Sequence, residues 1–180
     1  MLGGPRAQSF SQLLSFTAWA RSLGETPGGR VDRVDRRAAD PEEARRLGLE
    51  EGAELYLVLR VRTLSGRPVM VERTLYPPRV GALVAALPPE AVSHTEALVE
   101  HGVHFTDADH TIDLTWADED DTRLLACPPG QVLLRKRRRT TDPAGTPVEW
   151  SEDRYLPGTI AFTVHNSVAA TSLGRHPRTT

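Results

Sequence analysis

The sequence is short of the residues on which several classes of protein depend. Among its 180 residues it has one cysteine, Cys127, and one lysine, Lys136. A single cysteine excludes an internal disulfide framework and a cysteine-based metal cluster. No apolar run is long enough to span a membrane, and the N-terminal MLGGPRAQSFSQ lacks the apolar core of a signal peptide. We therefore expect a cytoplasmic protein without membrane contacts.

An excess of charge of one sign is also missing. The formal net charge is −2 and the pI is about 6.3. Because nucleic-acid-binding domains are usually basic over one face, we do not expect this chain to bind DNA by itself. Hydrophobic residues make up 39% and charged residues 26%, which favours one globular domain of ordinary size.

Motifs for cofactors and metals are missing too. The sequence has no Walker A, Rossmann or Gly-x-Ser-x-Gly pattern. His101 and His104 lie close together, and two aspartates and His110 follow, but Gly102 and an expected helix-to-strand turn separate them. We therefore predict no metal site and no cofactor.

One strongly basic run, RKRRR at 135–139, could indicate a nucleic-acid patch. In a strand, however, successive side chains point to opposite faces, so this run cannot present one continuous surface. Acidic residues flank it at Asp142, Glu149, Glu152 and Asp153. Pairing of these charges across a hairpin is the expected arrangement.

What the sequence does contain is an internal repeat, formed by residues 39–77 and 117–157. Identical residues fall in the same order in both segments, with one single-residue insertion. The matched positions are Ala39/Ala117, Asp40/Asp118, Arg45/Arg123, Gly52/Gly130, Arg60/Arg138, Gly66/Gly145, Pro68/Pro147, Val69/Val148 and Tyr76/Tyr155. This many ordered matches indicate a duplicated unit.

Each unit reads as a helix followed by a β-hairpin. Asp40 and Asp118 are typical helix N-caps followed by acidic first turns, and each helix is expected to end before a glycine, Gly52 or Gly130. The hairpin arms are predicted at 53–64 with 68–77 and at 131–141 with 147–156, each pair joined by a Gly-x-Pro turn.

Further elements are predicted around the two units. Helices are expected through about Leu23, over 83–87, and over 93–101 with Ser93 as N-cap and Glu96 completing a capping box. Strands are expected over 30–38 and 105–116. The sum is an α+β domain over 8–163, with about six mostly antiparallel strands and helices on one side. Residues 1–7 and 164–180 are predicted to be disordered.

Arg60 and Arg62 are the first candidates for a binding site. They stand two apart on one strand, so both side chains point to the same face, where two guanidinium groups suit a carboxylate or a phosphate. Glu72 follows on the second arm of the hairpin. The alternatives are two arginines on a solvated face and an ordinary ion pair between Arg62 and Glu72.

In their order along the chain, the motifs resemble a known family. They are Ser15-Phe16-Thr17 opening a helix, Leu-x-Leu-x-x-Gly at 47–52, Arg-x-Arg at 60–62, Gly-x-Pro-Val-x-x-Glu at 66–72, and Tyr155 in the last long strand. This order is similar to that of the UTRA (UbiC transcription regulator-associated) domain, the effector-binding half of HutC-like GntR regulators.

The resemblance implies a chorismate-lyase-like fold, a ligand cavity between the sheet and flanking helices, and a homodimer. It also implies a small, often anionic effector, such as a sugar phosphate or a carboxylate. Members of the family carry an N-terminal winged helix-turn-helix domain for DNA binding. Here the similarity begins within the first ten residues, so we expect a fragment or a sensor encoded alone.

The resemblance also extends the set of candidate ligand-binding residues. Four of them have a structural alternative: an N-cap for Ser15 and Ser93, a core position for Phe16, and packing for Tyr155, which has Tyr76 as its repeat partner. The full set is Ser15, Phe16, Thr17, Arg60, Arg62, Glu72, Ser93, Thr95, Glu149 and Tyr155.

The function expected from these observations is metabolite sensing for a transcriptional regulator, without enzymatic activity. Two alternatives remain at this point. One is a chorismate-lyase-like enzyme, because a shared fold does not determine function. The other is a ligand-free partner that dimerises with full-length regulators.

Overall fold

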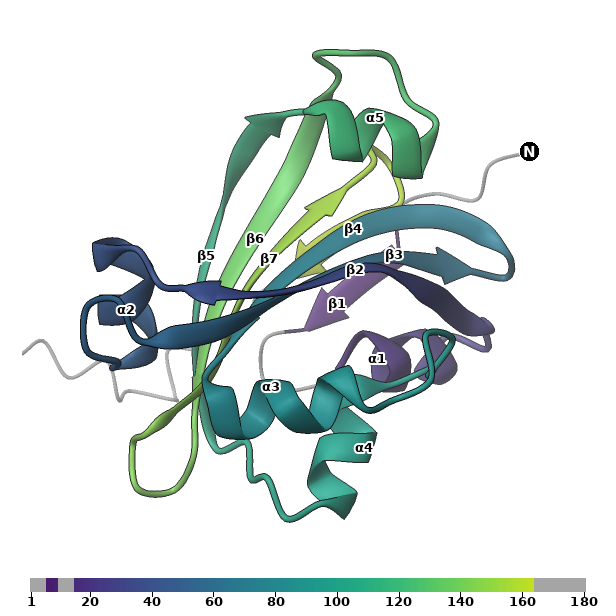
Figure 1. The fold of residues 1–180 in the computed structure, drawn as a ribbon. Helices are drawn as coiled ribbons and strands as arrows, with labels where there is room; N and C mark the ends of the chain where they lie inside the picture. Colours follow the sequence, from purple (N-terminus) through teal and green to yellow (C-terminus); the bar gives the residue numbers. More distant parts are fainter. Residues whose placement is uncertain (1–5, 10–14, 164–180) are drawn as a thin grey trace, which may run out of the picture.

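A computed structural model describes residues 6–9 and 15–163 of the chain. Residues 1–5, most of the expected disordered start, and the expected tail at 164–180 lie outside the described residues. Within them, the centre of the fold is a six-stranded antiparallel sheet with the strand order β2-β3-β4-β7-β6-β5 (Figure 1). This confirms the predicted α+β class with six antiparallel strands.

The strands and helices alternate along the chain as two similar sets. The first set comprises β2 (Pro27–Ala38), α2 (Pro41–Leu47), β3 (Glu54–Leu64) and β4 (Arg67–Tyr76). The second comprises β5 (Asp107–Trp116), α5 (Glu119–Leu125), β6 (Val132–Thr141) and β7 (Pro147–Tyr155). In the sheet the two sets meet at β4 and β7 and run outward in matching order. The duplicated helix-plus-hairpin unit is therefore present, and each copy gains a preceding strand.

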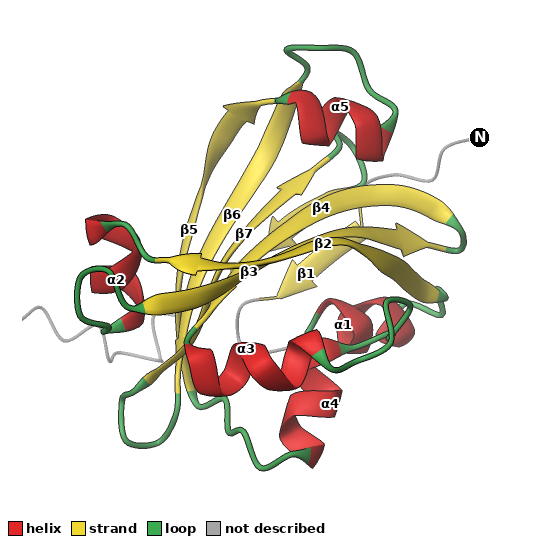
Figure 2. Cartoon of the chain, viewed as in Figure 1, coloured by secondary structure: helices red, strands yellow, loops and turns green. Residues whose placement is uncertain are grey.

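The remaining elements lie outside these sets. α1 (Phe16–Ser22) precedes the first set, and α3 (Pro78–Ala85) and α4 (His94–Glu100) connect the two sets. β1 (Arg6–Ser9) pairs in parallel with β8 (Ile160–Thr163) in a separate two-stranded sheet. Figure 2 shows the same arrangement coloured by type of secondary structure. No helix in the described ranges is long and apolar enough to cross a membrane.

The helices cover both faces of the sheet, which corrects the prediction that they lie on one side. α2 and α5 pack on the face formed by Leu55, Leu59 and Val61 of β3. α3 and α4 pack on the opposite face, against Val58 of β3 and Tyr76 of β4, and α1 packs farther along that face. Because the middle of β3 is buried on both faces, its apolar run from Leu55 to Leu59 does not alternate.

Local sequence signals account for α2 and α5. Asp40 and Asp118 each accept a hydrogen bond from the backbone N–H three residues later, and the side chain found there returns a bond to the cap, which completes a capping box. α2 ends at Gly48, whose φ of 63° is left-handed, and not just before Gly52 as predicted. α5 ends at Ala126, which is also left-handed, well before Gly130. In both units the later glycine belongs to the turn before the hairpin.

The predicted helix over 83–87 begins earlier in the structure. α3 starts at Pro78, a residue favoured in the first helical turn because its missing N–H has no partner there. Gly81 lies against the ring of Tyr56, and a Cβ at this position would stand 2.4 Å from a ring carbon. α3 therefore packs close to the sheet and buries Val80 and Val84.

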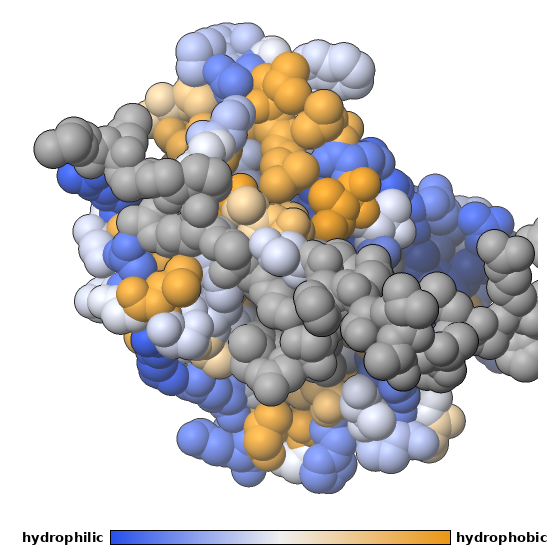
Figure 3. All heavy atoms as spheres, turned by 180° about the vertical axis from the view of Figure 1, so that it is seen from behind, coloured by the Kyte–Doolittle hydropathy of each residue, from blue (hydrophilic) through white to orange (hydrophobic). Residues whose placement is uncertain are grey.

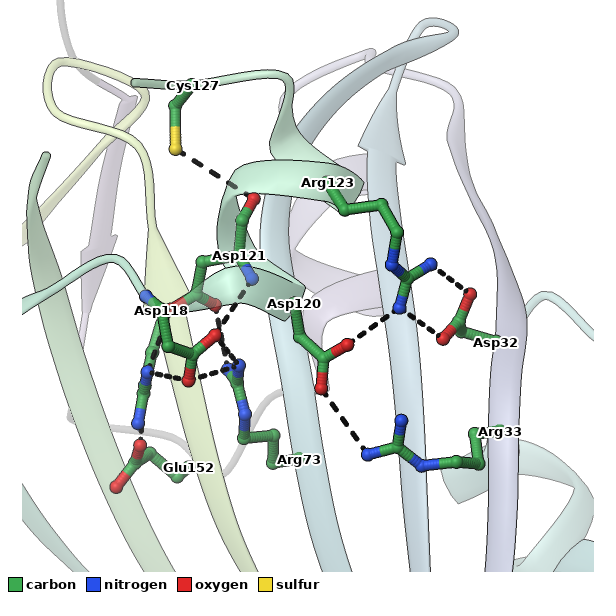
Figure 4. Close-up of polar contacts among 10 residues, drawn as sticks. Asp32, Arg33, Arg73, Asp118, Asp120, Asp121, Arg123, Cys127 and Glu152 are labelled. Carbon is green, nitrogen blue, oxygen red and sulfur yellow. Dashed lines mark hydrogen bonds and ion pairs between the residues drawn. The ribbon is translucent and has the colours of Figure 1, made fainter. Parts of the chain in front are cut away.

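α5 is tied to three strands by a network of charged side chains (Figure 4). Asp121 is fully buried and bonds Arg73 of β4 and Arg154 of β7, both at 2.8 Å. Arg123 pairs with Asp32 of β2 and with Asp120. This network holds the second repeat's helix over strands of both units.

Candidate functional site

The face of the sheet that lies under α1 and α4 carries a group of buried charges. Arg60 and Arg62 of β3 stand opposite Glu72 and Met70 of β4, and the same face continues onto β7 and β6. We call this group the charged face. Its ionisable members are Arg60, Arg62, Glu72, Lys136, Arg138, Glu149 and Asp153. Their burial excludes a solvated face as the role of Arg60 and Arg62, which are 1% and 3% exposed.

Arg62 connects four parts of the chain. Its Nε donates to the carbonyl of Gly28, and its Nη2 donates at 3.0 Å to both Thr17 Oγ1 and the Val92 carbonyl. Nη1 lies 3.4 Å from Glu72 Oε2, and the guanidinium also stacks 4.5 Å from the ring centroid of Phe16. Every guanidinium nitrogen of Arg62 is therefore occupied, so this residue organises the site.

Arg60 is bound in a different way. Its Nη2 donates to the Ala91 carbonyl at 2.5 Å, but Nε and Nη1 are buried and have no hydrogen-bond partner among the described residues. Burial lowers the pKa of Arg60 to about 10, although Glu72 opposes this effect. A buried guanidinium with unused donors is costly in the empty protein and suits an anionic ligand.

Glu72 remains ionised in spite of its burial. Burial alone would raise the pKa of its carboxyl group, but the charges of Arg60 and Arg62 outweigh this effect and lower it to about 2. The predicted ion pair with Arg62 is present, and Glu72 also lines the pocket beside Arg60. The two interpretations of Glu72 are thus compatible.

The second repeat contributes two buried ion pairs. Lys136 Nζ lies 2.9 Å from Asp153 Oδ2, and Arg138 pairs with Glu149, which also accepts from Thr140. On the opposite face Arg135 and Arg137 both pair with Asp113 of β5. The basic run is therefore split between the two faces, as its alternation predicts. Its residues 135–138 pair with acids, including Asp113, which was not among the expected partners, whereas Arg139 donates to the Arg46 carbonyl.

Tyr155 lies at the border of the charged face. It is 1% exposed, and its hydroxyl group lies 3.4 Å from Asp153 Oδ2. Its ring packs edge-on against Phe162 in the cluster beneath α1. These contacts match the packing role that its repeat partner indicates, and Tyr155 does not line either cavity beside the charged face.

The two candidate serines are helix N-caps. Ser15 Oγ accepts from Ala18 N, and Ser93 Oγ accepts from Glu96 N, each at 3.1 Å. The Glu96 carboxylate bonds Arg21 of α1. Both caps nevertheless border the pocket, together with Thr17 and Thr95.

Two adjoining cavities lie along the charged face. The inner one has a volume of only about 20 Å³ and is lined by the predicted residues of α1, α4, β3 and β4, together with His94, Lys136, Arg138 and Asp153. The outer one, of about 420 Å³, is lined by Val99, His104, Phe105, Thr140, Glu149 and neighbouring residues. Ser15, Thr95 and Arg138 border both. All candidates except Tyr155 therefore line one or both of these adjoining cavities.

His94 is a pocket residue that was not predicted as a candidate. Its ring is 3% exposed, and neither ring nitrogen has a hydrogen-bond partner within the described part of the chain. Burial and, next, the charge of Arg60 lower its pKa to about 4, so the ring is neutral at pH 7. In the sequence this histidine looks like an ordinary first residue of a helix, and nothing local marks it as buried.

The described residues contain no group of three or more histidine, cysteine or acidic side chains that could hold a metal ion. His101 instead contacts the Ala97 carbonyl through Nδ1 at the end of α4.

Comparisons with known proteins agree with this arrangement. The UTRA domain family model matches residues 22–159. An uncharacterized HTH-type transcriptional regulator of Rhizobium meliloti (strain 1021) is 28% identical over 118 residues, which cover 65% of this chain and 48% of that protein. The chain thus spans about half the length of this curated relative.

Solved structures show the same fold. The effector domain of PhnF from Mycobacterium smegmatis is 25% identical, with a TM-score of 0.80 over 89% of this chain and 99% of that domain. The C-terminal domain of the histidine utilization repressor from Pseudomonas syringae is 20% identical, with a TM-score of 0.68 over 78% of this chain and 99% of that domain. The chain belongs to the UTRA domain family, which is regulatory and not enzymatic.

Proposed function

We propose that this chain senses a small anionic metabolite, of the sugar-phosphate or carboxylate class, for a transcriptional regulator. The observation that carries this proposal is Arg60, a buried guanidinium that lines the pocket and has two nitrogens without a described partner. An anion there would use donors that the fold leaves idle, which is the usual reason for a functional buried charge.

The shape of the pocket divides the effector into two parts. The anionic group would lie in the inner cavity beside Arg60, which the Ser15, Ser93 and Thr95 side chains also line. The rest of the molecule would occupy the outer cavity, where Glu149 and Thr140 can bond hydroxyl groups and Val99 and Phe105 offer apolar contact. A bare inorganic anion would occupy only the first part, and side chains around the inner cavity, which has about 20 Å³ of free space, would have to move to admit it.

Arg62 gives the bound effector a route to the rest of the domain. It holds Thr17 of α1, the Val92 carbonyl before α4, and Gly28 of β2. An anion that attracts the side chain of Arg60 or of its neighbours would therefore also shift the segments that Arg62 contacts. In a full regulator this shift would bias a DNA-binding winged-helix domain, provided the effector prefers one of two states.

We also propose that the domain forms a homodimer through β5. In the described ranges this strand pairs only with β6, and it forms one edge of the sheet. Leu114 and Trp116 are 64% and 72% exposed, with Ile112 and Val132 beside them. Apolar side chains gather on the rear face of the molecule (Figure 3). An exposed apolar edge strand invites pairing, and a second copy offers the same edge.

The proposal is tested by measuring the thermal stability of the purified chain against a panel of phosphorylated and carboxylated metabolites. A ligand that binds only the folded state raises the Tm. We expect at least one member to raise it, and we expect the same compound to have no effect on Arg60→Met. If no anionic member of a broad panel binds, the sensing proposal is wrong.

A further inference from the structure

His94 lines the inner cavity, and neither nitrogen of its ring makes a hydrogen bond to the described residues. Its side chain is almost completely buried, both ring nitrogens lack a partner within the described residues, and it lines the cavity beside Arg60 and Thr95. Burying a polar group without a hydrogen bond costs about 1–3 kcal/mol. A histidine that only filled space would be replaced by an apolar residue without this cost.

The charges around His94 come from four strands. Arg60 and Arg62 approach from β3, Glu72 from β4, Lys136 and Arg138 from β6, and Asp153 from β7. Three carboxylates pair with three of the cations: Glu72 with Arg62, Asp153 with Lys136, and Glu149 with Arg138. Arg60 is the one cation of this set left without such an ion pair in the described structure.

This balance matches the charge of a monoanion. A dianion, such as the phosphate group of a monoester, would leave one negative charge uncompensated in a buried site, which is strongly unfavourable. The neutral ring of His94 can remove the excess, because protonation makes both ring nitrogens donors and adds one positive charge.

We propose that His94 is a direct ligand of the effector's anionic group and takes up one proton when a dianion binds, so that the pocket favours dianions over monocarboxylates as the pH falls. This inference rests on the proposed sensing function and narrows its ligand class. The low pKa of His94 in the empty pocket, about 4, agrees with it, since the ring is then neutral before binding.

Sulfate and acetate are suitable probes, because sulfate remains a dianion and acetate remains a monoanion between pH 5.5 and 7.5. Neither can take up the proton itself in this range. We expect the Kd of sulfate to rise about tenfold per pH unit if one proton is bound with each anion. The Kd of acetate should stay nearly constant, and the ring resonances of His94 should move to the protonated form when sulfate is added at pH 7.

His94→Gln keeps a hydrogen-bond donor but cannot titrate, whereas His101→Gln changes an exposed histidine at the end of the same helix and serves as the matched control. The pH slope for sulfate should vanish in the first variant and persist in the second. A slope that persists in His94→Gln would assign the proton to another group, such as His110 of β5, and would overturn the inference.

The outcomes separate the two proposals. If sulfate and acetate both bind without pH dependence, the role of His94 is wrong and the anion pocket stands. If neither anion binds, the pocket itself is wrong and the inference falls with it. The NMR measurement on the unmodified chain decides the role of His94 even if His94→Gln fails to fold.

Discussion

Arg60 and Arg62 stand two residues apart on the same face of β3, yet their guanidinium groups are bound in opposite ways. Arg62 bonds Gly28, Thr17, Val92 and Glu72 and leaves no nitrogen free. Arg60 donates from one nitrogen to the Ala91 carbonyl, and its other two nitrogens have no described partner. The first arginine supports the architecture of the site, and the second is available to a ligand.

Replacing each arginine by methionine should therefore affect stability to different extents. Arg62→Met leaves Glu72 without its closest cation and removes the link between α1 and β3, so we expect a loss of about 3–5 kcal/mol in the free energy of unfolding. Arg60→Met removes a buried, poorly bonded charge but also a charge that keeps Glu72 ionised, so we expect a smaller loss than for Arg62→Met. Urea unfolding measures both, and a larger loss for Arg60→Met would contradict this division of roles.

Features encoded by neighbouring residues could be predicted from the sequence, and features that depend on the packing of distant segments could not. The capping aspartates, the two hairpins and the convergence of Arg60, Arg62 and Glu72 all follow from local spacing. By contrast, the faces on which α2 and α5 pack depend on which side of β3 is apolar, and β3 is apolar on both sides.

The candidate site shows the same division. The sequence placed Arg60 and Arg62 on one face of a strand, but it could not reveal that Arg62 is saturated by two backbone carbonyls, Thr17 and Glu72, while Arg60 is not. His94 was missed for a related reason. What marks His94 is that neither ring nitrogen has a described hydrogen-bond partner. That property depends on how distant segments pack around the ring, which the sequence does not show.

The stability of the empty protein should fall in mild acid because of His94. Its pKa is about 4 in the folded chain and 6.5 when unperturbed, so the unfolded state binds more protons between these values. The stability contributed by the neutral ring is present above pH 6.5 and is lost as the pH falls toward 4, by up to about 3 kcal/mol. Urea unfolding from pH 7.5 to 4 should show this loss, and the loss should be smaller in His94→Gln by that amount. Equal pH profiles for the two proteins would refute it.

Filling the outer cavity should separate recognition of the anion from recognition of the whole effector. Val99 lines this cavity, is 52% exposed and does not border the inner one. Val99→Trp should therefore leave sulfate binding unchanged and weaken binding of any phosphorylated metabolite found in the panel by tenfold or more. Glu100→Trp, on the same helix but outside the pocket lining, is the control. Equal weakening of sulfate would show that the two cavities are not separate subsites.

Asp121 and Asp120 provide a matched pair for the network that anchors α5. Asp121 is fully buried between Arg73 and Arg154, so Asp121→Asn should cost about 3–5 kcal/mol, because it leaves two arginines with less compensation. Asp120 pairs with Arg33 and Arg123 on the surface, where an ion pair contributes about 0–1 kcal/mol, so Asp120→Asn should have little effect. Thermal unfolding of the two variants measures the difference, and similar Tm values would show that burial does not set the strength of this network.

The β5 dimer can be tested with one charge at each edge of the sheet. Leu114 on β5 is 64% exposed, and Val34 on β2, the opposite edge strand, is 39% exposed. In a dimer formed by two β5 strands, Leu114→Lys would place two lysines close together across the two-fold axis. Their charges would repel each other, and their hydration would oppose burial of the edge. We expect light scattering after size exclusion to show a dimer for the unmodified chain and for Val34→Lys, and a monomer for Leu114→Lys. If Val34→Lys alone dissociates the dimer, the interface lies at β2, and if the unmodified chain is a monomer at high concentration, no dimer forms through either edge.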